Sequence, residues 1–181
     1  KTEEGAVSAT GAFTSDITGL SLDTEYYVRS YAINIAGTTY GAEVSFTTDA
    51  FDGSGTEGDP YQVATPYQLN NVRNYPNSHF IQIADIDLTS SCSEGGDYYN
   101  SGEGWEPISI TVSSYNGQNH TINGLTINRS SSSYQGLFGS VYIKIENLGL
   151  TNVNIHGLGI TGALIGKMAD SNSSVTNCYS T

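Results

Sequence analysis

The segment Ile145-Glu146-Asn147-Leu148 recurs downstream as Val175-Thr176-Asn177-Cys178, and a similar segment, Ile122-Asn123-Gly124-Leu125, precedes it. A glycine-bounded segment also recurs, since Gly136-Leu137-Phe138-Gly139 is followed by Gly162-Ala163-Leu164-Ile165-Gly166, with Gly139 and Gly166 as equivalent last residues. Repeats with a period of roughly 20–50 residues, rich in strand-forming residues and without helical spacing, indicate short turns of chain that must stack to bury their apolar faces. The sequence therefore predicts a β-solenoid.

Alternation of apolar residues from Phe80 onward predicts which side chains face the core of this stack. They are Ile81, Ile83, Ile86, Leu88, Ile122, Leu125, Ile127, Ile145, Leu148 and Leu150. Asn147 and Asn177 occupy the same position in the repeat, whereas Asn123 is offset by one position. We therefore expect hydrogen-bonded amides between the last two turns.

Residues 66–74 predict the one short helix of the chain. Thr65 is its expected N-cap and Pro66 its first residue, and Leu69 and Val72 lie on one face. Such a helix would cover the first turn, where a stack of strands otherwise exposes backbone groups and apolar side chains.

The composition is that of an all-β protein with short strands. Of the 181 residues, 37% are hydrophobic and 13% charged. The net charge of −12 belongs to the first half, because residues 1–103 hold 15 acidic and three basic residues, whereas residues 104–181 hold three of each. So few basic residues argue against nucleic acid and anionic membranes as partners. No stretch approaches the ~20 apolar residues of a membrane span, so we expect no membrane insertion.

Strand and turn patterns alternate from Gly11 to Thr48. The segments that carry them include Phe13, Ile17-Thr18-Gly19-Leu20, Thr24-Glu25-Tyr26-Tyr27-Val28-Arg29-Ser30-Tyr31-Ala32, Asn34, Ala36-Gly37-Thr38, Tyr40-Gly41 and Val44-Ser45-Phe46-Thr47-Thr48. This order resembles the last three strands of a fibronectin type III domain, which implies that residues 1–49 form the C-terminal part of such a sandwich. In that family Leu20 and Tyr26 would form the tyrosine corner. The glycine-rich polar residues 50–60 predict a linker.

A second set of motifs spans residues 58–181. It comprises Gly58-Asp59-Pro60-Tyr61-Gln62-Val63, Thr65, Leu69, Val72-Arg73-Asn74, Phe80-Ile81-Gln82-Ile83, Ala84-Asp85-Ile86-Asp87-Leu88, Gly104-Trp105-Glu106-Pro107-Ile108, the run from Gly117 to Ile122, Gly136-Leu137-Phe138-Gly139 and Asn177-Cys178-Tyr179-Ser180-Thr181. These motifs resemble bacterial surface-protein regions with the GLUG motif, which occur in adhesin-like proteins and before the catalytic part of immunoglobulin A-specific metallopeptidases. The resemblance implies a right-handed parallel β-helix over residues 61–181 that continues beyond Thr181.

One turn departs from that family pattern. Where the family often has Asp-Gly-Asn-Gly-His, this chain has Asn116-Gly117-Gln118-Asn119-His120. The acidic residue is lost, which weakens the case for a cation at this turn.

The residues of the repeat region offer no arrangement that predicts catalysis. A lyase needs a suitably placed base, but no recurrent spacing aligns the basic residues Arg129, Lys144 and Lys167 on one face. A glycosidase needs two carboxylates close together, and no such spacing is found for the acidic residues Glu106, Glu146 and Asp170. His79, His120 and His156 show no metal-binding spacing, and neither do Cys92 and Cys178. Cys178 occupies the same position in the repeat as Leu125 and Leu148, which favours a place in the core. For Cys92 the sequence is compatible both with a free thiol and with a disulfide. We predict that the chain is not an enzyme.

Two groups of residues are candidates for binding. Asp85, Asp87, Glu94 and Asp97 surround a Gly/Ser-rich excursion in which carboxylates could hold calcium. Because Asp85-Ile86-Asp87-Leu88 also alternates as a strand does, plain outward-facing carboxylates are the favoured interpretation. We expect no other cofactor. The aromatic residues Tyr98, Tyr99, Trp105, Tyr115, Tyr134 and Tyr142 could form a stacking surface for sugar rings or a protein, with Trp105 also suited to the core.

Together these observations predict a non-enzymatic segment of a bacterial cell-surface or secreted adhesin-like protein. It would act outside the cell as a rigid display module that binds a glycan or protein of a host or neighbouring cell, or copies of itself. In one variant it belongs to an extracellular fibre, in which neighbouring molecules complete the sandwich and the stack of turns. The alternative is an accessory, non-catalytic region of a large secreted peptidase or carbohydrate-active enzyme.

Overall fold

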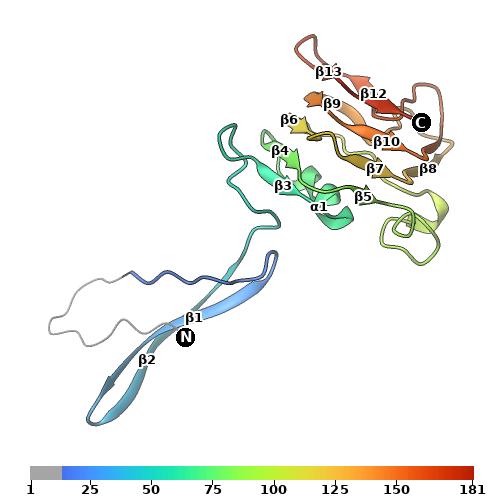
Figure 1. Ribbon diagram of the computed structural model, residues 1–181. Coiled ribbons are helices and arrows are strands. Elements are labelled where there is room, and N and C mark those ends of the chain that lie inside the picture. The colour runs from blue at the N-terminus through green and yellow to red at the C-terminus, as the bar shows by residue number, and fades with distance from the viewer. Residues whose placement is uncertain (1–13) are drawn as a thin grey trace. The chain divides into compact units, whose positions relative to one another are not determined.

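The computed structural model describes residues 14–181 and divides into two compact units, Lys1–Ala50 and Phe51–Thr181 (Figure 1). Strands dominate both units, which confirms the all-β class. In the described residues the helices are the α-helix α1 (Pro66–Asn71) and the 3-10 helices η1 (Val72–Asn74) and η2 (Asn100–Gly102).

The first unit contains one antiparallel hairpin within the described residues. Its strands are β1 (Glu25–Asn34) and β2 (Gly37–Thr47), and an irregularity in their pairing lies between Arg29 and Tyr31. Residues 14–24 form no strand, which differs from the three strands expected here, and Phe13 lies outside the described residues. The contact expected of a tyrosine corner is present, because the Ser21 N–H donates to the Tyr26 hydroxyl over 2.8 Å.

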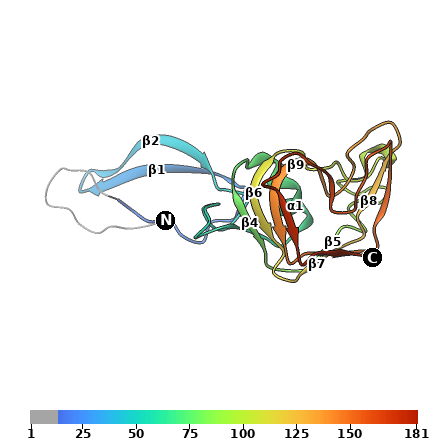
Figure 2. The same cartoon turned by 90° about the horizontal axis from the view of Figure 1, so that it is seen from above.

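The second unit is built from three parallel sheets, which the chain visits repeatedly. The first contains β3 (Tyr61–Val63), β4 (His79–Gln82), β6 (Thr111–Asn116), β9 (Phe138–Glu146), β12 (Ile165–Met168) and β13 (Ser174–Thr176). The second contains β5 (Ile86–Asp87), β7 (Thr121–Asn123), β10 (Gly149–Thr151) and β14 (Tyr179–Ser180), and the third contains β8 (Thr126–Arg129) and β11 (Asn154–Gly157). In Figure 2, β4, β6 and β9 lie on one side, β5 and β7 on another, and β8 on a third.

Strand pairing confirms two of the predicted repeats and corrects the third. Ile145 pairs with Val175, and Phe138 pairs with Ile165, as the recurring segments predicted. Ile122 pairs with Leu150 and not with Ile145. The segment Ile122-Asn123-Gly124-Leu125 is therefore not equivalent to the segment Ile145-Glu146-Asn147-Leu148. Ile122 lies in the second sheet, whereas Ile145 and Val175 lie in the first.

The core-facing positions agree with the prediction from Ile86 onward and differ in β4. All eight predicted positions from Ile86 to Leu150 are buried. In β4, however, Phe80 and Gln82 are buried and Ile81 is only half-buried, and Ile83, which follows the strand, is exposed. The predicted register was therefore wrong by one position. Both alternating sets in this strand contain a large side chain, and the apolar pattern alone favoured the isoleucines.

The helix that was predicted over residues 66–74 is present as α1 followed by η1. The Thr65 side chain accepts a hydrogen bond from the Gln68 N–H over 3.1 Å, and Leu69 and Val72 are fully buried. Pro66 begins the helix, where its missing N–H leaves no hydrogen bond unmade. One apolar face of the helix is therefore buried in the core of the second unit, as its spacing predicted.

The boundary between the units lies before Phe51, not after the predicted linker. The Phe51 side chain is buried, and its ring lies 5.1–5.5 Å from those of Tyr61, Tyr75 and Phe80. Asp52 also accepts a backbone hydrogen bond from Gln62. Part of the polar segment 50–60 therefore belongs to the second unit, because one aromatic residue within it fills the core.

Two rows of hydrogen-bonded amides run across the turns of the second unit. In the first, Asn177 donates to Asn147 over 3.2 Å and Asn147 donates to Asn116 over 3.3 Å, which confirms the predicted pair and extends it by one turn. In the second, Asn123 donates to Asp87 over 3.0 Å and accepts from Asn152 over 2.7 Å. These rows tie the register of each turn to that of its neighbour.

Candidate functional site

The segment of residues 88–104, which we call the long loop, leaves the stack after β5 and carries several of the predicted binding residues. It folds compactly on itself, since the Cys92 N–H donates to the Leu88 carbonyl and the Tyr98 N–H to the Ser91 carbonyl. Gly96 has no room for a side chain, because a Cβ there would meet the carbonyl oxygens of Ser90 and Ser91. The long loop is therefore an ordered projection from the stack.

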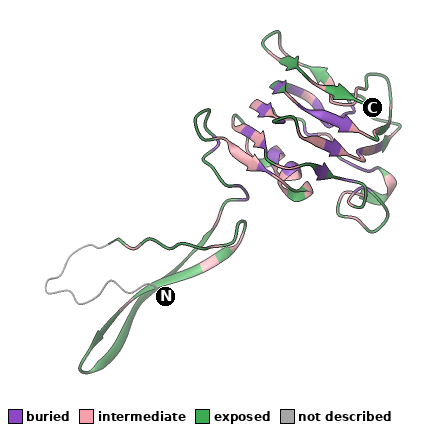
Figure 3. Cartoon of the chain, in the orientation of Figure 1, coloured by how far each residue is buried: buried purple, intermediate pink, exposed green. Residues whose placement is uncertain are grey.

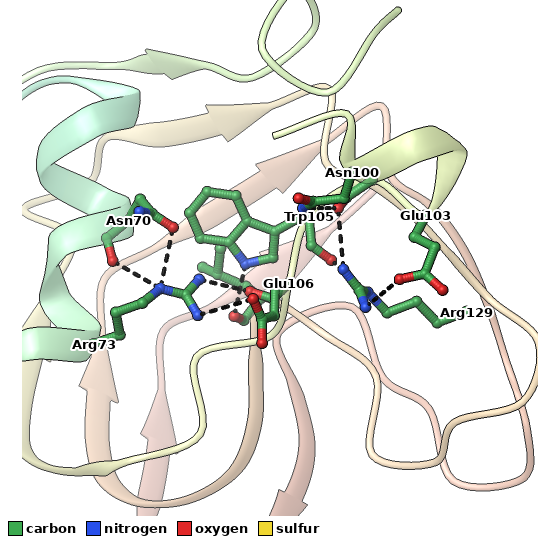
Figure 4. Close-up of polar contacts among 9 residues, drawn as sticks. Asn70, Arg73, Asn100, Glu103, Trp105, Glu106 and Arg129 are labelled. Carbon is green, nitrogen blue, oxygen red and sulfur yellow. Dashed lines mark hydrogen bonds and ion pairs between the residues drawn. The ribbon is translucent and has the colours of Figure 1, made fainter. Parts of the chain in front are cut away.

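Arg129 holds the far end of the long loop (Figure 4). Its guanidinium forms an ion pair of 2.6 Å with Glu103 and donates from Nε to the Trp105 carbonyl over 3.3 Å. Asn100 adds a hydrogen bond of 2.8 Å from its side-chain amide to the Gly104 carbonyl. Because Arg129 lies in β8, these contacts attach the long loop to the third sheet.

Arg73 holds the segment that follows the long loop. Its Nε donates to the Asn70 carbonyl over 3.0 Å and its Nη2 to the Glu106 carbonyl over 2.8 Å, while the Glu106 carboxylate lies 3.9 Å away. The guanidinium also lies 5.7 Å from the centre of the Trp105 ring, within the range of a cation–π interaction. Burial lowers the pKa of Arg73, and the nearby Glu106 carboxylate opposes that shift.

Trp105 is the buried centre between the two arginines (Figure 4). Its indole N–H donates to the Leu137 carbonyl over 3.2 Å, and Tyr98 packs edge-on against its ring at 5.2 Å. Trp105 is therefore a core residue that supports the long loop and not part of an exposed stacking surface.

Two partly exposed tyrosines lie on the elements around this centre. Tyr98, in the long loop, is half-buried, and Tyr67, on α1, is 46% exposed. Burial raises the pKa of Tyr98, and Asp97 and Tyr67 add to this shift. The sequence did not single out Tyr67, because its place in a short helix gave no sign of a role at the surface. Tyr99 is half-buried, and its hydroxyl lies beside Gly102.

The remaining predicted aromatic residues lie elsewhere. Tyr115 is fully buried in β6, where its hydroxyl donates to Gln82 over 3.0 Å, so it cannot bind a ligand at the surface. Tyr134 lies between β8 and β9, with the Lys167 ammonium 5.2 Å from its ring centre. Tyr142 is exposed on the outer side of β9.

The four acidic residues proposed for calcium fall into two separate places. Asp85 accepts from the Thr121 N–H over 2.7 Å, and Asp87 accepts from the Thr89 hydroxyl over 2.6 Å, so both carboxylates are bound to donors of the protein. Glu94 and Asp97 line a shallow, open hollow of the long loop. Within residues 14–181 no three histidine, cysteine or acidic side chains gather closely enough to hold a metal ion.

Hydrogen bonding lowers the pKa of both aspartates. The largest cause is the Thr121 backbone N–H for Asp85 and the Thr89 hydroxyl for Asp87, and burial opposes both shifts. His120 contributes a weaker contact of 3.3 Å to Asp85. The hydrogen bonds that the protein donates to these carboxylates therefore favour their ionised form.

The histidines and cysteines do not assemble a reactive group in the described residues. His79 contacts the Ser114 hydroxyl at 2.8 Å, but on the outer side of a sheet and without a carboxylate partner in the part of the chain that the structure describes. Both cysteines are free thiols; Cys92 is buried, which raises its pKa, and Cys178 is half-buried. Because Tyr179 pairs with Gly149, Cys178 aligns with Leu148 as predicted, but Leu125 occupies a different position in the turn.

Two known proteins match part of this chain. A protein of Evansella cellulosilytica named "Putative Gly-rich membrane protein" is 37% identical over 126 residues, which make up 64% of this chain and 14% of that protein. Halomucin of Haloquadratum walsbyi is 31% identical over 139 residues, or 71% of this chain and 2% of its own length. The chain thus spans a small part of either relative.

No protein-family profile and no solved structure matches the chain. None of the helices among residues 14–181 has the length and apolar character that crossing a bilayer requires.

Proposed function

We propose that this chain is a non-enzymatic segment of a cell-surface or secreted protein, in which a rigid stack of turns displays a glycan-binding surface. The second unit would be a right-handed parallel β-helix of the GLUG type, and the first unit the C-terminal part of a fibronectin type III domain. The parallel pairing across three sheets supports the former, and the Ser21–Tyr26 hydrogen bond supports the latter. One relative is named as a membrane protein, which fits a surface location.

The observation that carries this proposal is the anchoring of the long loop beside α1. Arg129 and Arg73 hold the loop and the segment after it to two different elements, so the surface they support is fixed before a ligand arrives. A preformed surface loses less conformational entropy on binding than a flexible loop would. Tyr98 and Arg73 both lie against the Trp105 ring, and Tyr67 is on α1, whose Asn70 carbonyl accepts a hydrogen bond from Arg73.

The chemistry of this surface suits a sugar. Aromatic faces stack on the apolar side of a sugar ring, and neighbouring charged groups hydrogen-bond its hydroxyls. The Glu106 side chain is 67% exposed and can accept such hydrogen bonds. We therefore favour a glycan of a host or neighbouring cell over a protein partner. We call the surface formed by Tyr67, Tyr98, Arg73 and Glu106 the tyrosine–arginine surface.

A glycan array probed with the 181-residue chain tests this proposal. For any glycan that binds, Tyr67→Ala should weaken binding roughly five- to a hundredfold, because one stacked ring contributes roughly 1–3 kcal/mol. Tyr142→Ala is the matched control, since Tyr142 is 47% exposed, similar to Tyr67, but lies in β9. Absence of glycan binding, or equal loss in the two variants, would contradict the proposal.

The alternative role as an accessory region of a large secreted hydrolase has less support. The chain matches small parts of long proteins, which suits an accessory region, but neither relative is named as a hydrolase.

A further inference from the structure

Two asparagines of the second unit are followed by glycine, in Asn116-Gly117 and Asn123-Gly124, and the sequence contains no other Asn-Gly pair. In such a pair the backbone nitrogen of the glycine can attack the side-chain carbonyl carbon of the asparagine, because the glycine has no side chain that hinders the approach. Other members of the two rows of amides are followed by larger residues, as in Asn147-Leu148. The two Asn-Gly pairs are therefore the positions in these rows that are most prone to deamidation.

The fold requires the glycine in both pairs. A Cβ on Gly117 would meet the Asn147 carbonyl oxygen, and a Cβ on Gly124, which has a φ of +74°, would meet Thr89. A larger residue, which would slow the reaction, has no room at either position. Protection against deamidation therefore has to come from contacts of the folded chain.

Each of the two asparagines lies directly opposite an acidic residue of a neighbouring parallel strand. Asn116, in β6, pairs with Glu146 of β9, and its Nδ2 donates to the Glu146 carboxylate over 2.7 Å. Asn123, in β7, pairs with Asp87 of β5, and its Nδ2 donates to the Asp87 carboxylate over 3.0 Å. These strands lie where the buried positions of the second unit are concentrated (Figure 3). In both pairs a carboxylate thus holds the amide nitrogen that would leave as ammonia.

The nitrogen that would attack is also held. The Gly117 N–H donates to the Glu146 carbonyl over 2.8 Å, and the Gly124 N–H donates to the Thr151 carbonyl over 2.9 Å. Attack requires the glycine nitrogen to lose its proton and to approach the asparagine side chain, so this hydrogen bond has to break first. Deamidation therefore needs a local opening of the stacked turns.

We propose that Asn116 and Asn123 are deamidation sites that the folded stack protects through Glu146 and Asp87. In the reaction the glycine nitrogen loses its proton and bonds to the asparagine Cγ, the bond between Cγ and Nδ2 breaks, and ammonia leaves. Water then opens the succinimide ring, and the product is aspartate or isoaspartate. Water is the only co-reactant.

Deamidation would turn each attractive pair into a repulsive one. A carboxylate at position 123 would lie directly opposite Asp87, to which the amide now donates a hydrogen bond. Like charges that face each other destabilise a pair of strands, so the opened turn would close less favourably than before. One opening event can thus leave a lasting change in the stack. This inference does not depend on the tyrosine–arginine surface.

Peptide mapping by mass spectrometry, during incubation of the 181-residue chain at mildly alkaline pH, measures deamidation at each site. Both sites should react at least about tenfold more slowly in the folded chain than in the same chain unfolded in guanidinium chloride, because the folded turns must open first. Glu146→Ala should accelerate deamidation at Asn116 at least about threefold and leave Asn123 unchanged, because it removes one charged acceptor. Asp87→Ala should do the reverse. Glu146→Gln keeps an acceptor oxygen and should react like the wild type.

Three results would overturn the proposal. Equal rates in the folded and the unfolded chain would show that the contacts give no protection. If an alanine variant that unfolds at the wild-type temperature accelerated neither site, or both sites equally, the opposing carboxylate would not be the protecting group. Hydrogen exchange in the wild type needs no variant, and rapid exchange of the Gly117 and Gly124 amides would contradict the proposal as well.

Discussion

At the scale of single residues, the charges of the second unit are stabilised by short contacts with neighbouring turns. Asp87 accepts hydrogen bonds from the backbone N–H and the hydroxyl of Thr89, and from the Asn123 amide of the next turn. A carboxylate with several donors favours its ionised form, so its pKa lies below the ordinary value of 3.8. Asp87, which the sequence suggested as a calcium ligand, is therefore the first acceptor of the row that continues through Asn123 and Asn152.

The substitution Thr89→Val tests this account, because it removes the hydroxyl that contributes most to the lowered pKa of Asp87. We expect the pKa of Asp87, measured by carboxyl-carbon NMR titration, to rise toward 3.8. Since the folded-state pKa is lowered, the contribution of Asp87 to stability is present above about pH 4 and is lost as the pH falls through the folded pKa. Asp170, whose pKa is lowered by hydrogen bonds from Asn172 and Ser171, is the reference group, and its titration should be the same in both proteins. An unchanged titration of Asp87 in the variant would contradict the account.

Buried polar residues show what the sequence pattern could not reveal. Gln82 is fully buried because its amide donates to the carbonyls of Ala84 and Thr121, and its carbonyl accepts from Tyr115. Apolar alternation places a glutamine outside the core, since an unpaired buried amide is costly. Two of these partners are distant in the sequence, so the compensation appears only in the folded structure.

At the scale of secondary-structure elements, the attachment of the long loop rests on arginine geometry. Arg129 donates to the Glu103 carboxylate and to two consecutive backbone carbonyls, those of Gly104 and Trp105. A guanidinium offers several donors in one plane, which an ammonium group cannot reproduce. The ordered state of the long loop should therefore depend on this one side chain.

Replacement of Arg129 by Met tests that dependence, because Met retains most of the aliphatic packing but no donors. We expect faster hydrogen exchange of the amides in residues 88–104, and a loss of about 1–3 kcal/mol in the free energy of unfolding. Arg29→Met, which changes an arginine in β1, should leave both quantities unchanged. Equal exchange rates in the wild type and Arg129→Met would show that the loop is ordered by its internal hydrogen bonds alone.

Elements with local sequence signals were predictable, and those that depend on distant contacts were not. The helix α1 was predicted because Thr65, Pro66 and the apolar spacing all act within one turn of helix. The pairings of β9 with β12 and β13 followed from repeated segments. The long loop has no repeat partner, and the two arginines that hold it lie on either side of it in the sequence, so its place beside α1 could not be predicted.

At the scale of the whole molecule, the two units have different means of stability. The hairpin of the first unit has two strands in the described residues and exposes many large apolar side chains, whereas the second unit contains nearly all of the buried core. An isolated two-stranded hairpin is at best marginally stable in water. We therefore expect the second unit to fold without the first.

A fragment of residues 51–181 tests this expectation together with the position of the boundary. It should retain the far-ultraviolet circular dichroism of a β protein and unfold cooperatively, because Phe51, the helix α1, nearly all of the buried core and both rows of amides lie within it. A matched fragment with Phe51→Ala should be less stable by about 3–5 kcal/mol, since the buried ring contacts Tyr61, Tyr75 and Phe80. If residues 51–60 were a linker, the alanine substitution would have no effect. If the fragment failed to fold, the first unit would be needed for the stability of the second.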